Sequence, residues 1–247
     1  MAGEGRLKWD QDGQRLYETG TDHGVLYVMN AAGTAYTNGV AWNGLTAVTE
    51  SPSGAEETAL WADNIKYLSL RSAEEFGGTI EAYTYPEEFA ECDGSKEVAD
   101  GVFIGQQTRK KFGFSYRSII GNDTLGNDYS EKIHVIYGCS INPSERAYST
   151  VNDSPEAATF SWEFSTIAQK GTLTIGGETK EYSAAEITID CSKISTAAAN
   201  AIKDKLWGTD PTTGTSASQG SAPTLPDFAT FIKFVQDAIT DNPIPTT

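Results

Sequence analysis

The sequence has few of the residues from which active sites are usually recognised. Its 247 residues include only two histidines and three cysteines, and Cys92, Cys139 and Cys191 show no C-x-x-C spacing. An odd number of cysteines without that spacing predicts neither a disulfide framework nor a zinc site. We interpret all three as small apolar side chains of the interior.

Motifs that bind nucleotides or activate a nucleophile are also absent. The chain contains no G-x-x-x-x-G-K-[ST], no G-x-G-x-x-G that opens a helix and no G-x-S-x-G. We expect His23 in a turn and His134 as a hydrogen-bonded residue within a strand, neither with a recognisable catalytic partner. The segment Asp123–Asp128 departs from the EF-hand calcium pattern. The sequence therefore predicts no enzyme, no catalytic residue, no cofactor and no metal ion.

Positive charge and long hydrophobic runs are scarce as well. Lys and Arg number 18 against 34 Asp and Glu, a net charge of −16, which argues against binding nucleic acid through its phosphates. No stretch approaches the ~18–20 apolar residues of a membrane span, and Met1–Arg6 lacks the apolar region of a signal peptide. We expect a chain without a membrane span that starts in a cytosol, and its 11% aromatic content predicts that it folds.

The acidic excess is concentrated in one fifth of the chain. Residues 50–100 hold thirteen acidic and three basic residues and carry a net charge of −10. They include the pairs Glu56-Glu57, Glu74-Glu75 and Glu87-Glu88. Because neighbours in an extended strand point to opposite faces, we interpret these pairs as solvated surface and not as catalytic carboxylates.

Residues 101–120 have the opposite character, because they contain four basic residues and no acidic one. The basic residues are Arg109, Lys110, Lys111 and Arg117. They are either an ordinary solvated face or an inter-subunit patch that pairs with the acidic region of another copy of the chain.

Alternating apolar and polar residues predict an antiparallel β body. The alternation is clearest at 157–166, which is typical of a half-buried strand. The same period at 112–117 and 132–139, with Ile136 as the exception, surrounds a Gly/Asn/Asp-rich segment at 121–128 and predicts a hairpin. Further strands are predicted at 40–49, 63–70, 78–85, 102–107, 171–175 and 179–190.

Two helices are predicted near the C-terminus. The first spans roughly 195–207, with Ser195 or Thr196 as N-cap and Gly208 after its end. The second runs from Pro226 to about Thr240 and carries an apolar stripe that must be buried, for which we expect a two-helix layer that covers the outer face of the β body. The Thr/Ser/Gly/Pro-rich segment between them, residues 209–225, is expected to act as a linker that lets the last helix dock away from its neighbour.

Several stretches resemble a known family. They are LKWDQDG at 7–13, YETG at 17–20, GVAWNGL at 39–45, ESPSGA at 50–55, ADNIKY at 62–67, TIEAYTYP at 79–86 and PSERAYSTVNDSPE at 143–156. These stretches resemble the major tail tube proteins of siphophages, the long non-contractile-tailed bacteriophages, of Gram-positive bacteria. The resemblance covers roughly residues 7–207.

The resemblance implies a structural subunit that closes into hexameric rings, which stack into a conduit for DNA ejection. It implies an antiparallel β-sandwich or barrel with a flanking helix in residues 1–208, including an N-terminal arm. The linker 209–225 and an amphipathic helix with a tail at 226–247 would follow. The implied partners are other copies of the chain, the tape-measure protein and the tail tip and terminator proteins. The implied location is the virion tail, assembled in the host cytoplasm, with DNA passing through the lumen without specific binding.

By analogy with the family, two segments are candidates for contacts between subunits. A ring-stacking loop is expected at Glu50, Ser51, Pro52, Ser53, Gly54, Glu56 and Glu57. The segment Leu7–Asn30 is expected to serve as an arm. An ordinary mobile loop and an ordinary terminus are the alternatives.

A different class of function is also compatible with the sequence. A β-sandwich adhesion or carbohydrate-binding module would use exposed aromatic side chains, for which Trp61 and Tyr148 are candidates. An enzyme on a jelly-roll scaffold ranks behind it because the chain offers no catalytic motif.

Overall fold

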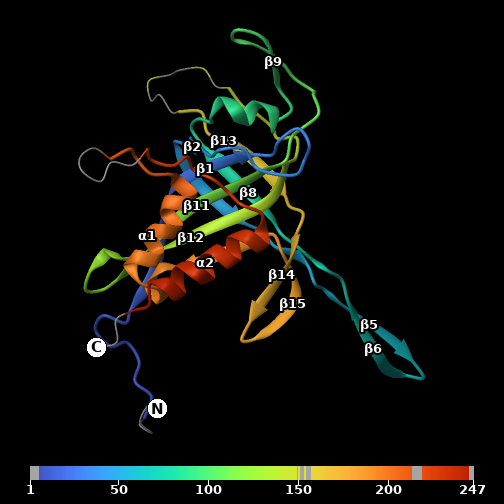
Figure 1. The fold of residues 1–247 in the computed structure, drawn as a ribbon. Coiled ribbons are helices and arrows are strands. Elements are labelled where there is room, and N and C mark those ends of the chain that lie inside the picture. Colours follow the sequence, from blue (N-terminus) through green and yellow to red (C-terminus); the bar gives the residue numbers. More distant parts are fainter. Residues whose placement is uncertain (1–5, 149, 151–152, 154–156, 213–218, 245–247) are drawn as a thin grey trace.

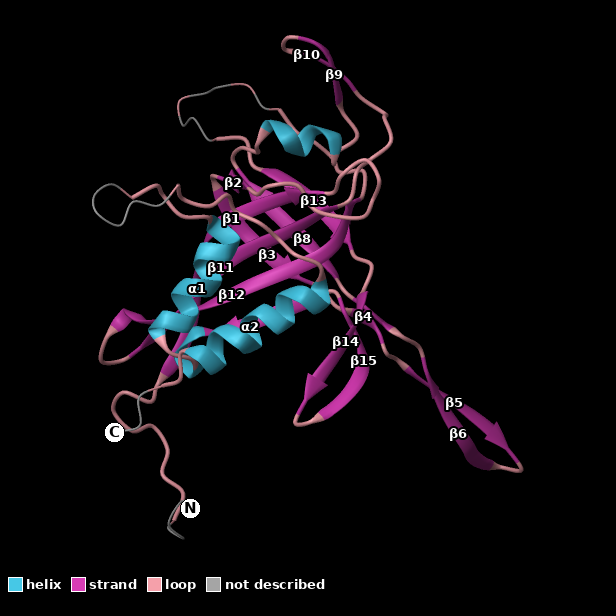
Figure 2. Ribbon diagram, in the orientation of Figure 1, coloured by secondary structure: helices cyan, strands magenta, loops and turns pink. Residues whose placement is uncertain are grey.

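The computed structural model describes residues 6–148, 150, 153, 157–212 and 219–244. Strands dominate, and two helices lie close together at the C-terminal end of the chain (Figures 1 and 2). The elements are β1 (Leu16–Val28), β2 (Val40–Trp42), β3 (Leu45–Glu50), β4 (Ser53–Gly54), β5 (Glu57–Ala62), β6 (Ile65–Arg71), β7 (Glu74–Glu75), β8 (Gly77–Ala82), η1 (Glu87–Glu91), β9 (Lys96–Ala99), β10 (Val102–Ile104), β11 (Phe112–Asn122), β12 (Gly126–Ile141), β13 (Phe160–Ser165), β14 (Gln169–Ile175), β15 (Glu178–Ala184), β16 (Glu186–Asp190), η2 (Cys191–Lys193), α1 (Thr196–Trp207) and α2 (Phe228–Asp241).

Eight strands form one antiparallel sheet. Its order is β2-β1-β11-β12-β13-β8-β3, and β16 pairs with β12 beside this path. The predicted hairpin around residues 121–128 is confirmed as β11 and β12, and the predicted half-buried strand at 157–166 is confirmed as β13. The chain is therefore mainly β with a large antiparallel sheet and two helices, as the sequence predicted.

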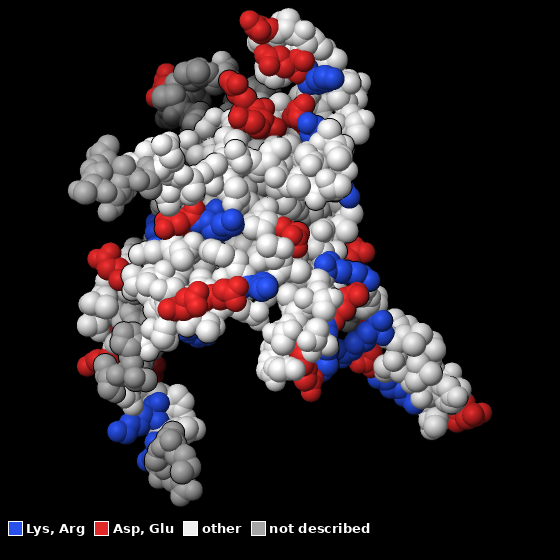
Figure 3. Space-filling model, in the orientation of Figure 1, with Lys and Arg blue, Asp and Glu red and all other residues white. Residues whose placement is uncertain are grey.

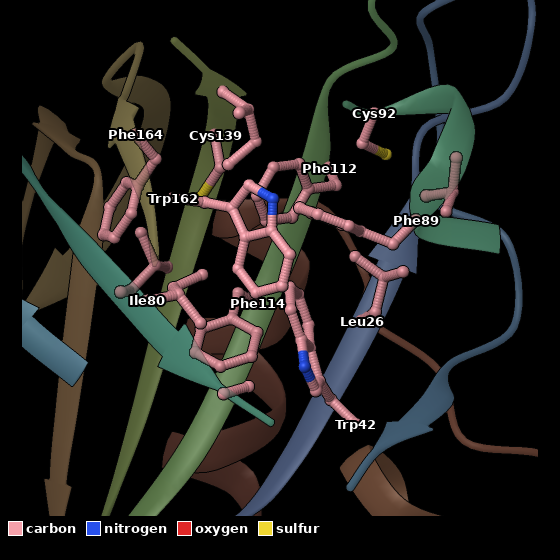
Figure 4. Packing of buried hydrophobic residues seen from close by; sticks show 14 of the residues in the cluster. Leu26, Trp42, Ile80, Phe89, Cys92, Phe112, Phe114, Cys139, Trp162 and Phe164 are labelled. Atoms are coloured by element: carbon pink, nitrogen blue, oxygen red, sulfur yellow. The ribbon is translucent and has the colours of Figure 1, made fainter. Parts of the chain in front are cut away.

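The first hydrophobic core lies on one face of β11 and β12 and joins strands far apart in the sheet order. Trp42 of β2 and Trp162 of β13 meet edge to face, with ring centroids 5.6 Å apart. Phe89 of η1 packs against both rings (Figure 4). Edge-to-face aromatic pairs add to the free energy gained from burial alone. Cys92 and Cys139 are buried in this core, as predicted, whereas Cys191 is half-buried.

The second core lies on the opposite face of the same strands, under the two helices. Side chains of β1 and β12 pack there against α1 and α2, and the hydroxyl of Tyr27 donates a hydrogen bond of 2.7 Å to the carbonyl of Leu206. Both faces of β12 are buried, and Ile136 points into the first core. It is therefore apolar although it lies on the side of the strand that the sequence predicted to be polar. This explains the exception in the predicted alternation.

The two helices start and end largely where the sequence predicts. Ser195 accepts a hydrogen bond from the amide of Ala198 at the N-terminus of α1. The prediction that α2 docks away from α1 is wrong, because the Ser195 hydroxyl donates a hydrogen bond of 2.6 Å to the carbonyl of Asn242, just after α2. An isolated bridge between Thr209 and Ser221 folds the linker back on itself, so both apolar stripes cover one sheet face. Residues 213–218 of the linker and 245–247 of the tail lie outside the described residues.

Several predicted strands have different ends in the structure. The strand expected at 40–49 is divided into β2 and β3 at Asn43-Gly44, where Gly44 has a φ of +77° that side chains rarely adopt. The strand expected at 179–190 is divided at Ala185 into β15 and β16, which belong to different sheets. The strands expected at 78–85 and 102–107 end earlier, at Ala82 and Ile104.

The prediction that Leu7–Asn30 forms an arm is wrong for most of these residues. Residues Leu16–Val28 form β1, which lies between β2 and β11 inside the sheet. His23 lies at an irregularity of this strand and not in a turn, with a φ of +49°. Before the strand, Gly13 donates a hydrogen bond of 3.0 Å to Asp123, which ties the segment to the β11–β12 turn.

Candidate assembly surfaces

The most prominent feature outside the cores is a long β-hairpin between β3 and β8. It leaves the body at Ser51, returns at Phe76 and projects far from the sheet (Figure 1). The short pair β4–β7 closes its root and the pair β5–β6 forms its outer part. Asp63 and Asn64 form the turn with φ values of +50° and +64°, as in the tight turns that join hairpin strands. At about 3.3 Å per residue, each arm is roughly 40 Å long.

The outer hairpin exposes large apolar side chains on a part of the chain that contributes nothing to either core. Trp61 is 70% exposed and Tyr67 is 66% exposed. The other exposed apolar residues of β5 and β6 are Leu60, Ile65, Leu68 and Leu70. In Figure 3 most of the outer hairpin is uncharged, with acidic atoms at its tip and basic atoms nearer its root. A two-stranded hairpin is marginally stable alone in water, and contiguous exposed apolar surface marks interaction sites.

The predicted ring-stacking loop is the outgoing arm of this hairpin. Glu50 ends β3, Ser53 and Gly54 form β4, and Glu57 begins β5. The other residues of the predicted loop, Ser51, Pro52 and Glu56, lie between these strands. Glu57 forms ion pairs with Lys66 and Arg71 on the returning arm, and the hydroxyl of Ser69 donates to it at 2.5 Å. The strand predicted at 63–70 is therefore shifted, because Asp63-Asn64 is the turn. The stacking role itself stays a prediction.

The four basic residues of the predicted inter-subunit patch do not form one surface. Arg109, Lys110 and Lys111 precede β11, and Lys110 pairs with Glu91 of the same chain. Arg117 lies further along β11, where it is 24% exposed and bonds to Asp22 and Glu131. Arg117 is six residues beyond Lys111, and an extended strand advances by about 3.3 Å per residue, so the two side chains lie far apart. The structure therefore brings together at most the first three.

A polar, exposed surface covers the outer side of β13, β8 and β3. The strand register places Ser161 beside Glu81 and Ala47, and Glu163 beside Thr79 and Thr49. The side chains of Ser161, Glu163 and Thr49 are exposed, whereas Trp162 and Ile80 point into the first core. The charged residues of this surface are Glu81 and Glu163, so it is acidic.

A second group of polar side chains was not predicted. Glu50 of β3, His134 of β12 and Glu186 of β16 offer ligand atoms that all lie within 4.8 Å of one another. His134 is a hydrogen-bonded strand residue, as predicted, since its Nε2 lies 3.0 Å from the Ser118 hydroxyl. The two glutamates come from positions 84 and 52 residues away in the sequence, so no local motif could have connected them to it.

Comparisons with known proteins add no assignment. No protein-family model and no curated protein sequence matches the chain. Among the described residues, neither helix is long and apolar enough to cross a membrane.

Proposed function

We propose that the protein is a structural subunit of a bacteriophage tail tube, in which hexameric rings stack into a conduit for DNA. The resemblance of its sequence to siphophage major tail proteins motivates the proposal. The projecting hairpin is the observation that carries it. A two-stranded ribbon of this length exposes six large hydrophobic residues. Another copy of the chain that covered the ribbon would bury these residues and stabilise it.

The hairpin is suited to reach across a subunit boundary. It lies outside the body, and its arms pair in an antiparallel way at β4–β7 and again along β5–β6. Glu57 also forms ion pairs with Lys66 and Arg71 of the returning arm. In a stacked tube the hairpin would lie on the neighbouring ring and bury Trp61, Tyr67 and Ile65 there.

The acidic outer surface of β13, β8 and β3 is the candidate lumen wall. Glu81 and Glu163 would face the DNA, and an acidic wall repels phosphates over a Debye length of about 8–10 Å. Such a surface guides DNA and does not hold it. In this proposal the fold is the β-sandwich or barrel of tail tubes, the chain resides in the virion tail and catalyses no reaction. Its partners are other copies of itself, the tape-measure protein and the tip and terminator proteins.

Electron microscopy of the concentrated full chain tests the proposal. We expect stacked rings or tubes from the wild-type protein, and from a Val98→Ser variant, which alters an exposed apolar residue on a different hairpin. A Trp61→Ser/Ile65→Ser variant should keep its melting temperature, because neither side chain is in a core, yet lose stacking. Tubes that form equally well from the double variant would contradict the assigned role of the hairpin.

A carbohydrate-binding or adhesion module is the second candidate. The exposure of Trp61 favours it, because aromatic rings of such modules stack on sugars. Tyr148 is also exposed, although its ring edge lies against Phe160 with centroids 6.4 Å apart. Tyr83, just beyond β8 and two residues after Glu81, is 54% exposed and adds an aromatic side chain beside the acidic sheet surface. A monomer at every concentration that binds a glycan array through Trp61 would support this candidate.

A further inference from the structure

Three side chains with metal-ligand atoms converge at the root of the projecting hairpin. Glu50 is the last residue of β3, His134 lies within β12, and Glu186 begins β16. His134 Nδ1 lies 3.5 Å from Glu50 Oε1 and 3.7 Å from Glu186 Oε1. Both distances exceed those of an N–H···O hydrogen bond. The nitrogen is fully buried and has no hydrogen-bond partner, so two carboxylates face a buried imidazole nitrogen across a gap.

Each of the three side chains is already oriented by an outer partner. The Tyr116 hydroxyl donates a hydrogen bond of 2.6 Å to Glu50, and the Thr188 hydroxyl donates one of 2.5 Å to Glu186. Ser118 Oγ lies 3.0 Å from His134 Nε2, and the Tyr116 ring stacks on the imidazole at 4.5 Å. When Nε2 carries the proton, the lone pair of Nδ1 points into the gap. Outer-shell hydrogen bonds of this kind fix the orientation of the ligands in metal centres.

The charge of the cluster requires a cation, which is either a proton on His134 or a metal ion. Burial lowers the pKa of His134, but the two carboxylates outweigh it and raise that pKa to about 9, so a metal ion must displace this proton to bind. Two carboxylates beside an imidazole lone pair repel one another in a half-buried site unless a positive charge lies between them. The ligand atoms around one zinc ion, with bonds of 2.0–2.2 Å, lie about 3 to 4 Å apart, which matches the two distances to Nδ1. One imidazole with two carboxylates suits Zn²⁺ and related transition metals better than Mg²⁺ or Ca²⁺, which prefer oxygen ligands alone.

We propose that Glu50, His134 and Glu186 form a binding site for a divalent transition-metal ion, with Zn²⁺ as the preferred ion. Glu50 and Glu186 are each partly exposed on one side, so the ion has a path from solvent. A water molecule would supply the fourth ligand. The site connects three strands that are distant in sequence, and one of them leads directly into the hairpin at Ser51. Bound metal would therefore fix the root of the hairpin relative to the sheet.

Metal binding to the full chain tests the proposal. We expect titration calorimetry to show one Zn²⁺ per chain and a saturating excess to raise the melting temperature by about 5 °C. Co²⁺ should give a visible absorption band, because its spectrum reports nitrogen and carboxylate ligands directly. Hydrogen exchange at residues 51–54 should slow when Zn²⁺ is added.

Matched variants separate this site from incidental zinc binding. Glu186→Gln keeps the shape of a partly exposed side chain and should abolish the cobalt band and the thermal shift while circular dichroism remains that of the wild type. Ser118→Ala, which changes only an outer partner, should weaken Zn²⁺ binding about tenfold. Glu181→Gln, on exposed β15, should bind Zn²⁺ like the wild type.

Two outcomes would overturn the proposal. One is the absence of stoichiometric Zn²⁺ binding at micromolar concentrations at pH 7.5, which would leave a protonated imidazole as the cation of the cluster. The other is undiminished binding in Glu186→Gln. Since tube assembly is not part of these measurements, their failure would not bear on the proposed function.

Discussion

Gly138 is a residue where backbone conformation and packing both exclude a side chain. Its φ is +63°, and a Cβ atom placed there would lie 2.6 Å from the carbonyl oxygen of Ile167. Gly101 has a similar φ of +75° but open space around it. We expect Gly138→Ala to lower the free energy of unfolding by more than about 2 kcal/mol and Gly101→Ala by about 1 kcal/mol, since only the first adds a backbone clash to the strain. Urea unfolding of both variants measures the difference, and equal losses would contradict this assignment.

Arg117 joins two acidic side chains from neighbouring strands. Its hydrogen bonds to Asp22, at 2.7 and 2.6 Å, lower the pKa of that carboxyl group against the opposing effect of burial. Burial raises the pKa of Glu131, but hydrogen bonds from Lys203 and Arg117 outweigh it and lower the pKa below its usual value. A carboxyl group whose pKa is lower in the folded chain stabilises the fold above its unfolded pKa of about 4. That contribution is lost as pH falls through the folded pKa.

Arg117→Gln should therefore destabilise the protein in a pH-dependent way. At pH 7 we expect a loss of about 1–2 kcal/mol, because Asp22 loses the two hydrogen bonds that Arg117 donates and Glu131 keeps only the one from Lys203. As pH falls through the lowered pKa values of Asp22 and Glu131 in the folded chain, the difference from wild type should shrink, since both carboxyl groups become protonated in either protein. Arg71→Gln is the control, because that arginine forms only an exposed pair with Glu57 and should change stability by less than about 0.5 kcal/mol. A constant difference between pH 7 and pH 3 would exclude the ionic explanation.

At the scale of elements, α2 is part of the core and not an appendage. Phe231 is fully buried against the sheet and α1, whereas Ile239 on the same helix is 37% exposed. We expect Phe231→Ala to cost about 3–5 kcal/mol and Ile239→Ala less than about 1 kcal/mol. Both variants should unfold in one transition by circular dichroism and tryptophan fluorescence. A separate early transition in Phe231→Ala would mean that α2 unfolds independently of the sheet.

The sequence predicted best those strands and helices that have one buried side and one exposed side. β13 alternates because one face meets the first core, and both helices carry apolar stripes because one side of each meets the second core. The projecting hairpin was predicted only in part, since both faces of β5 and β6 are exposed and no alternation marks them. The cluster of Glu50, His134 and Glu186 was missed because the sheet register, and not sequence proximity, brings its strands together.

At the scale of the whole molecule, the net charge of −16 has more than one physical role. Some acidic residues, such as Glu57, Glu91 and Glu131, are paired with basic residues of the same chain. Two of the four basic residues of the predicted inter-subunit patch, Lys110 and Arg117, form such pairs. Glu81, which is partly exposed, and Glu163, which is exposed, lie on the outer side of β8 and β13. In the proposed tube, these two residues are the ones through which the charge of the chain would act on DNA.

In the proposed tube, reversing the charge of Glu81 and Glu163 should turn a lumen wall that repels DNA into one that holds it. We expect a Glu81→Lys/Glu163→Lys variant to fold and assemble, because neither side chain contributes to a core, and its tubes to retain a short DNA duplex in pelleting assays at low salt. Retention should disappear as salt rises, because the attraction depends on counterion release. Glu178→Lys/Glu181→Lys makes the same change of charge on exposed β15 and should retain no more DNA than wild type. Equal retention by both variants would place the lumen elsewhere, since only a face that lines the channel can distinguish them.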